Sequence, residues 1–234
     1  MAKIIAQMIA HNEGDRFLPD VLNHLSKIVD VIVFTDDCSN DNTLEIARSI
    51  PNCNAFESQW DESHFPVNEG ELRMAAWQNL EQFAEWGDWI LAIDADEKLF
   101  MPVSDLHLTV NSTQADVLGI AFFHMWNEFQ YRVDKAWRPN LSSRLFRYFP
   151  HGSFFQRKLA CGSEPTYVLD LIRMGQVDWQ TGLRMQHLGY VKDEDKKMKY
   201  DRYMKLDGGD FHAKAHIESI MDPHPTLEVW RDNG

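Results

Sequence analysis

Hydrophobic positions divide the first hundred residues into alternating strand-like and helix-like segments. Short apolar runs predict four strands, at residues 3–10, 29–35, 54–58 and 89–93. Between them, apolar residues at helical spacing predict helices at 16–25, 43–49 and 69–86. This alternation predicts an α/β fold: a Rossmann-like, mostly parallel sheet with right-handed crossovers, flanked by helices.

The alternation weakens after residue 105. Residues 116–125, 143–148 and 183–190 are predicted strands, residues 193–206 a strongly charged helix, and residues 149–162 a loop. The remaining residues are polar, with a turn at Gly208-Gly209, and we expect little order in them. No repeat, low-complexity segment or linker divides the chain, so we expect a single domain over residues 1–234.

Two of the predicted strands end in acidic residues. Asp36 and Asp37 follow one strand, and Asp94, Asp96 and Glu97 follow another. Open α/β sheets bind ligands outside the carboxyl ends of their strands, so both sets of acids can face one crevice. Carboxylates two residues apart can converge on one cation, and hard oxygen ligands suit Mg²⁺ or Mn²⁺. Taken alone, an Asp-x-Asp motif is also compatible with a solvated turn that caps a short helix.

Composition and charge restrict the class of protein further. The 234 residues are 44% hydrophobic and 25% charged, as in a globular chain that buries its own core. The formal net charge of −13 argues against general nucleic-acid binding. Three scattered cysteines form no disulfide framework, and no apolar run suits a signal peptide or a transmembrane segment. We therefore expect a cytoplasmic protein.

Four short motifs occur in order in the first hundred residues. They are His-Asn-Glu at 11–13, Asp-Asp-Cys-Ser-Asn-Asp-Asn-Thr at 36–43, Arg73 on the third predicted helix, and Asp94-Ala95-Asp96. In this order they resemble the family 2 nucleotide-sugar glycosyltransferases, which have the GT-A fold. Residues 143–147, 162–165 and 187–190 resemble second-half elements of some bacterial and phage members. The resemblance implies a nucleotide-sugar-binding half at 1–105 and an acceptor-binding half at 106–234.

The resemblance also implies roles in donor binding, with a UDP-sugar as the expected donor. Asp37 would accept a hydrogen bond from the base, a task suited to a carboxylate, while Asp36 would support that loop or the ribose. Arg73 would reach the base or the ribose-phosphate side. Asp94 would bind the ribose hydroxyls, with Ala95 beside it in the donor site.

A Mn²⁺ or Mg²⁺ cofactor is implied by the same resemblance. Asp96 is the expected ligand, His187 a further ligand, and Asp94 a ligand through water. Mg²⁺ usually keeps several waters and takes one or two carboxylates plus phosphate oxygens, so few protein ligands are needed. The alternative for His187 is a structural histidine.

Glu164 is the candidate general base. Transfer to an acceptor hydroxyl needs a carboxylate that removes its proton on the face opposite the diphosphate, and one such displacement inverts the anomeric centre. Glu164 lies in Gly-Ser-Glu-Pro, whereas the family often has a His-Glu or Glu-Asp pair there. Asp170 and Glu128 are the alternatives.

Two further groups of side chains lie in the second half. Cations on the charged helix could close over the diphosphate, or form a solvated helix face; they are Lys196, Lys199 and Arg202. Aromatic residues could form an acceptor platform, or belong to the core; they are Trp126, Trp137, Phe154 and Phe155.

The predicted function is metal-dependent, inverting sugar transfer from a nucleotide diphosphate sugar to an acceptor hydroxyl. The acceptor could be a glycan, a protein, a lipid-linked glycan or a modified nucleobase. One alternative is a nucleotidyltransferase on a similar sheet, but that class usually has a glycine-rich phosphate loop, and residues 11–15 contain one glycine. The other is a non-catalytic nucleotide-sugar or carbohydrate-binding domain, which would tolerate the loss of Glu164.

Overall fold

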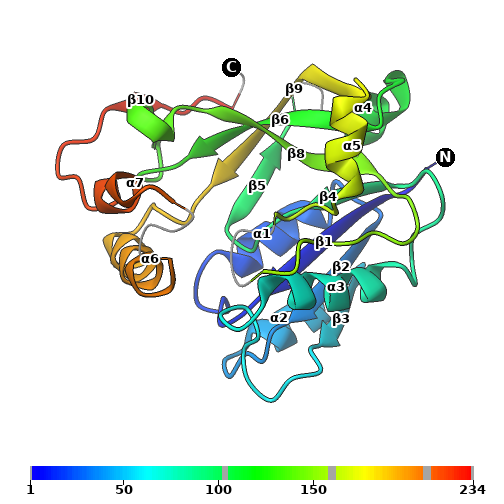
Figure 1. Cartoon of the computed structure of the whole chain (residues 1–234), viewed down its shortest axis with the longest axis horizontal. Helices are drawn as coiled ribbons and strands as arrows, with labels where there is room; N and C mark the ends of the chain where they lie inside the picture. Colours follow the sequence, from blue (N-terminus) through cyan, green and yellow to red (C-terminus); the bar gives the residue numbers. More distant parts are fainter. Residues whose placement is uncertain (1, 102–104, 158–161, 208–211, 233–234) are drawn as a thin grey trace.

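The structure is a computed structural model that describes residues 2–101, 105–157, 162–207 and 212–232 (Figure 1). The main sheet is formed by β1 (Ile4–Ala10), β2 (Val31–Asp36), β3 (Cys53–Glu57), β4 (Trp89–Ala92), β5 (Glu97–Phe100), β6 (Val117–His124), β8 (Asn140–Arg147) and β9 (Val177–His187). A second sheet pairs β7 (Gln130–Arg132) with β10 (Leu227–Val229). The helices are α1 (Leu18–Leu25), α2 (Thr43–Ser49), α3 (Glu69–Leu80), α4 (Leu106–Ser112), α5 (Tyr167–Arg173), α6 (Asp193–Leu206) and α7 (Lys214–Ser219), with a 3-10 helix η1 at Lys135–Trp137.

Strand β1 determines where the ligand-binding edge of the sheet lies. The strand order is β3-β2-β1-β4-β8-β6-β9-β5, and β1 runs parallel to both of its neighbours. The chain moves outward from β1 to β3 and then returns to the other side of β1 as β4. This reversal is the topological switch point at which open α/β sheets bind ligands. Because Ala10 pairs with Asp36 and Gln7 with Ala92, the carboxyl ends of the three strands meet at one edge.

The core lies on both faces of this sheet, because successive strand residues point to opposite sides. Ile4 and Met8 of β1 belong to a cluster with buried residues of α1, α2 and α4. Ile5 points the other way, into a cluster with Trp77 and Leu80 of α3. The sequence prediction of an α/β fold with helices on a mostly parallel sheet is confirmed.

The second half extends the same sheet with antiparallel strands. β8 lies between β4 and β6 and runs antiparallel to both, while β9 runs parallel to β6. β5 is one of the two edge strands of this sheet and pairs with β9 (Figure 1). The register of this pair places Glu97 opposite His187. The acids after β4 are therefore brought next to side chains from the far end of the sequence.

Several element boundaries differ from the sequence prediction. The helix expected at 69–86 ends at Leu80, and the chain continues through turns to Gly87, whose φ of 88° favours glycine. The strand expected at 183–190 begins at Val177, because it pairs along the length of β6. β5, α4 and α5 were not predicted, since each is short and its periodicity is weak.

The prediction of little order after residue 206 is wrong for the described residues. Helix α7 packs Ile217 and Ile220 against a cluster that contains Trp126, Trp137 and Tyr190. Strand β10 pairs with β7. The predicted Gly-Gly turn at 208–209 lies outside the described residues. Within the described ranges, no helix has both the length and the apolar composition needed to cross a bilayer.

Docking of α7 can be tested by truncating one buried side chain. Ile217 is 1% exposed, so Ile217→Ala should lower the free energy of unfolding by about 2–4 kcal/mol through the lost contacts and the cavity left behind. Met221, which is 48% exposed, is the matched control, and Met221→Ala should have little effect. Urea denaturation measures both; equal costs for the two variants would mean that α7 is not docked.

Candidate active site

One cavity of about 970 Å³ opens at the edge where β1, β2 and β4 end. It brings together most of the residues predicted from the sequence; those that line it are Asp37, Arg73, Asp94, Ala95, Asp96, Glu164 and His187. Asp36 is not among the lining residues. It is 3% exposed and accepts a hydrogen bond from the Ser39 backbone N–H at 2.9 Å, so it shapes the loop after β2. This agrees with the expected support role of Asp36.

Asp37 fixes the wall at the β2 end of the cavity. Its carboxylate accepts hydrogen bonds from the Ser63 hydroxyl at 2.6 Å and from the backbone N–H groups of His64 and Phe65 at 2.9 and 3.1 Å. Trp60 stacks on the His64 ring at a centroid distance of 3.9 Å. The loop at 63–65 therefore depends on Asp37, and Ser63 and Phe65 line the cavity with it.

Arg73 enters the cavity from α3. Its guanidinium lies 2.7 Å from the Glu69 carboxylate one helical turn earlier, which holds the side chain against the helix. Its charge also acts on Asp94 across the cavity. Arg73 thus lines the cavity, while its predicted contact with a donor stays a prediction.

The acids that follow β4 form a tight turn around Arg144 of β8. The Asp94 backbone N–H donates to the Glu97 carboxylate at 2.9 Å, and Arg144 lies 2.6 Å from Glu97 and 3.3 Å from Asp94. Burial raises the pKa of Glu97 to about 8, against the opposing charge of Arg144. For Asp94, burial is outweighed by the charges of Arg144 and Arg73, which hold its pKa below the ordinary value.

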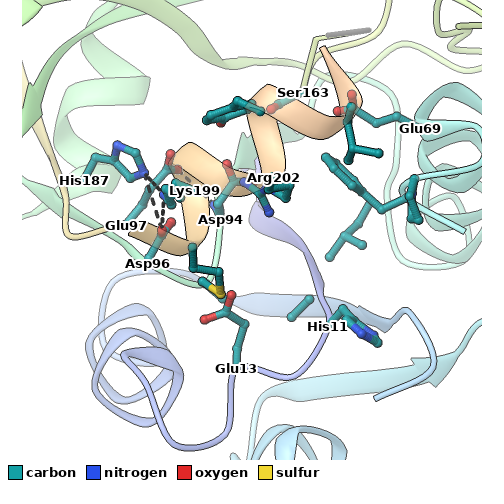
Figure 2. Close-up of a pocket in the computed structure, with 18 of the residues that line it drawn as sticks. His11, Glu13, Glu69, Asp94, Asp96, Glu97, Ser163, His187, Lys199 and Arg202 are labelled. Atoms are coloured by element: carbon teal, nitrogen blue, oxygen red, sulfur yellow. Dashed lines mark hydrogen bonds and ion pairs between the residues drawn. The ribbon is translucent and has the colours of Figure 1, made fainter. Parts of the chain in front are cut away.

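Asp96 and His187 converge on a cation from α6. Their closest side-chain atoms, Oδ2 and Nε2, are 3.4 Å apart, and the Lys199 ammonium lies 3.0 Å from each (Figure 2). Burial would raise the pKa of Asp96, but the charge of Lys199 and the hydrogen bonding around the carboxylate hold it well below its ordinary value. Burial, helped by Lys199, lowers the pKa of His187. An ionised carboxylate and a neutral imidazole are the states in which these groups bind metals.

These two residues fit a divalent metal ion, provided that the remaining ligands come from water and phosphate oxygens. Among the described residues, no three histidine, cysteine or acidic side chains are grouped as a protein cage for a metal. Asp94, the third predicted ligand, is tied to Arg144 at 3.3 Å. Its role as a ligand through water stays a prediction.

Glu164 lines the cavity from the segment before α5. The hydroxyl of Ser143, next to Arg144 on β8, donates to Glu164 Oε1 at 2.7 Å and orients the carboxylate. The two alternative bases, Asp170 and Glu128, are exposed and do not line the cavity. Of the three acids considered, Glu164 is the one that lines the cavity, and its role as general base stays a prediction.

Helix α6 covers the cavity with positive charge. Lys199 and Arg202 line the cavity, whereas Lys196 pairs with Asp193 at 2.9 Å and does not line it. An ion pair of 3.1 Å between Arg16 and Asp195 fixes the N-terminal end of α6 to the loop after β1. Lys199 and Arg202 therefore lie at the cavity and Lys196 does not, and a diphosphate clamp formed by Lys199 and Arg202 stays a prediction.

The predicted aromatic platform is mostly core. Trp126 and Phe154 are buried in two different clusters, and Phe155 is half exposed outside the cavity. Trp137 is 1% exposed yet contributes to the cavity lining. The alternative that most of these rings belong to the core therefore agrees with the structure, and a role for Trp137 at the acceptor stays a prediction.

Glu13 and Arg144 also line the cavity, although the sequence analysis gave neither of them a role in the site. Glu13, in the turn after β1, forms an ion pair of 2.5 Å with Arg16, and burial raises its pKa to about 7 against that charge. Both residues lie in the motifs that carried the family resemblance, at 11–13 and 143–147. That overlap was the one sequence signal that could have identified them.

Comparisons with known proteins agree with this geometry. Residues 6–167 match Glycosyl transferase family 2, while curated proteins give no significant match. A mannosyltransferase from Pyrobaculum calidifontis, solved with GDP-Man and Mn²⁺, has a TM-score of 0.54 at 13% identity, over 87% of this chain and 61% of that chain.

Two other solved structures are less similar overall. Mannosyl-3-phosphoglycerate synthase from Rubrobacter xylanophilus has a TM-score of 0.37 at 18% identity, over 53% of this chain and 41% of that chain. 4-Diphosphocytidyl-2C-methyl-D-erythritol synthase has a TM-score of 0.43 at 14% identity, over 85% of this chain and 96% of that chain. The chain thus spans less than two thirds of the two sugar-transferring structures.

The sheet, its switch point and the acids beside it define a protein with the GT-A fold, which the Pyrobaculum structure shares. The family match covers well over half of the residues, so the chain belongs to glycosyl transferase family 2. The predicted family and fold type are confirmed. The sugar-transfer activity (EC 2.4) and the nucleotide-sugar donor that the family implies are taken up as proposals below.

The Asp37 hydrogen bonds predict a measurable cost when they are removed. Asp37→Ala should lower the free energy of unfolding by about 2–3 kcal/mol, because three donors lose a charged acceptor. Asp61→Ala, an exposed position on the same loop, should stay within about 0.5 kcal/mol of wild type. Urea denaturation tests this, and similar values for the two variants would contradict it.

Glu13 predicts a pH dependence of stability. Between its ordinary pKa of 4.5 and the folded value of about 7, the folded protein keeps a proton that the unfolded chain loses, so stability falls as pH rises. Glu13→Gln removes this loss and should be more stable than wild type at pH 8 by up to about 3 kcal/mol, with little gain near pH 5. Glu62→Gln, an exposed control, should show no such trend; an equal gain at both pH values would refute the prediction.

Proposed function

We propose that this chain transfers a sugar from a nucleotide diphosphate sugar to an acceptor hydroxyl, with inversion, in the cavity beneath α6. The observation that carries the proposal is that Asp37 and Asp96, which follow different strands, line the same cavity. Its volume of about 970 Å³ is at the upper end of the usual range for small-molecule sites, which leaves room for a donor and part of an acceptor.

The base of the donor lies at the Asp37 end in this proposal, against the loop that Asp37 holds. Asp94 and Arg73 face the ribose, and Lys199 and Arg202 face the diphosphate. Asp96 and His187 would hold Mn²⁺ or Mg²⁺, and a metal bound there would supply positive charge that stabilises the leaving diphosphate. The donor that we propose is a UDP-sugar; GDP-Man, which the Pyrobaculum relative binds, defines the second class to test.

Glu164 acts as the general base in the proposed reaction. Its carboxylate removes the proton from the acceptor hydroxyl as the acceptor oxygen bonds to the anomeric carbon and the bond to the diphosphate breaks. The Ser143 hydroxyl orients this carboxylate through the 2.7 Å hydrogen bond. Arg144, beside Ser143 on β8, lies close enough for the charge of Glu164 to act on it. The general base and the acids of the donor site thus share one cation.

Glu164→Gln separates this enzyme from a non-catalytic binding domain. The amide keeps the size of the side chain but cannot take a proton, so turnover should fall by about 10²–10⁴-fold while donor binding is retained. Turnover is measured as nucleotide release with panels of UDP- and GDP-sugars and Mn²⁺, and donor binding by calorimetry. Asp170→Asn and Glu128→Gln are the matched comparisons, and both should remain active.

Each other outcome has a definite meaning. Full activity of Glu164→Gln would place the base elsewhere, and loss of activity in Asp170→Asn or Glu128→Gln would identify which acid it is. Binding of a nucleotide sugar without transfer or hydrolysis for any donor would favour the binding domain.

A further inference from the structure

The Lys199 ammonium lies in the position that a metal ion would take between Asp96 and His187. It is 3.0 Å from Asp96 Oδ2 and 3.0 Å from His187 Nε2, and those two atoms are 3.4 Å apart (Figure 2). A metal ion lies about 2.0–2.2 Å from the carboxylate oxygen and imidazole nitrogen that bind it, and the 3.4 Å separation suits two such bonds. The ammonium and a metal ion would therefore use the same two lone pairs.

The Lys199 ammonium is enclosed by surrounding side chains and backbone. Lys199 is 6% exposed, and its ammonium faces the Tyr190 ring at 4.7 Å. A Cβ atom on Gly189 would lie 1.9 Å from the ammonium nitrogen and 2.3 Å from Asp96 Oδ2, so only glycine leaves room for this contact. Lys199 is therefore not a surface lysine that happens to lie near an acid.

His187 presents the lone pair of its Nε2 atom to this cation. An ammonium group only donates hydrogen bonds, so Nε2 must be the unprotonated nitrogen of the ring. The proton then lies on Nδ1, which donates to His124 Nδ1 at 2.9 Å. A second residue that accepts from the other ring nitrogen is the usual support of a metal-binding histidine. The Asp96 carboxylate and the His187 Nε2 lone pair are thus oriented to bind a cation, and the Lys199 ammonium is the cation that they bind in this structure.

We propose that Lys199 is an internal cation that competes with divalent metal for the Asp96–His187 pair, so that metal binding requires the ammonium to leave. The inference rests on the proposed function only in that a metal is used during transfer. Two positive charges within contact distance repel strongly in a buried site, so the two cations exclude each other. The displaced ammonium would face the cavity with Arg202, where a donor diphosphate would bind it.

Binding of Mn²⁺ alone tests the competition without donor or acceptor. Lys199→Met should bind Mn²⁺ more tightly than wild type, by roughly tenfold or more, because a like charge is removed from the site. Lys197→Met is the matched control: it removes the same charge from the exposed side of α6 and should match wild type. Adding Asp96→Asn to Lys199→Met should abolish the gain. Titration calorimetry gives the affinities, and thermal unfolding shows that each variant is folded.

A second measurement uses the wild-type protein and so does not depend on the folding of a variant. Acetylation of lysines, read by mass spectrometry, should modify Lys199 faster with saturating Mn²⁺ than without it, because the ammonium is released. Unchanged labelling at saturating Mn²⁺, or a Lys199→Met affinity no tighter than wild type, would overturn the proposal. Tighter Mn²⁺ binding by Lys199→Met together with no transfer from any donor would reject the proposed function and leave this inference standing.

Discussion

The balance of charge at one edge of the sheet is the constraint on which the rest of the site depends. Asp94, Asp96 and Glu97 follow one another within a single turn, and like charges this close in a buried site repel strongly. Arg144 and Lys199 offset that repulsion, one from β8 and one from α6. The acids after β4 therefore come from the first half of the chain and the two cations that pair with them from the second, so neither half forms this part of the site alone.

The first half of the fold was predictable because its local patterns and its tertiary structure agree. Strands β1, β2 and β4 are buried on both faces, so β4 is a continuous apolar run, β1 is interrupted only by Gln7, and β2 becomes polar only at Thr35 and Asp36. Helix α1 between β1 and β2 has one apolar face. In the second half of the chain, the local sequence pattern and the tertiary structure agree less well. β5 is four residues long and alternates buried and half-buried positions, and α7 gains its stability from contacts with distant aromatic side chains. Short segments of this kind are defined by their partners and not by their own periodicity.

The site residues also differ in how well the sequence identifies them: some are marked by the residues next to them, and others only by partners far away in the chain. Asp37 and Asp96 were identifiable because each immediately follows an apolar strand. The partners of the acids were not, since Arg144 lies 47 residues from Glu97 and Lys199 lies 103 residues from Asp96. A single sequence shows that a charged helix exists at 193–206, but not which of its lysines turns inward. Gly189 permits the inward position of Lys199, because the absent side chain leaves space for the ammonium.

The position of β5 at the sheet edge has a consequence for the order in which the protein assembles. β1, β2, β3 and β4 are all made within the first part of the chain and can pair as they leave the ribosome. β5 has to wait for β9, and β4 has an open side until β8 is made. The nascent chain therefore has an open β4 edge until β8 is made, and Asp96 lacks its Lys199 partner until α6 is made. The edge that carries these acids is completed only after β8, β9 and α6 have been synthesised.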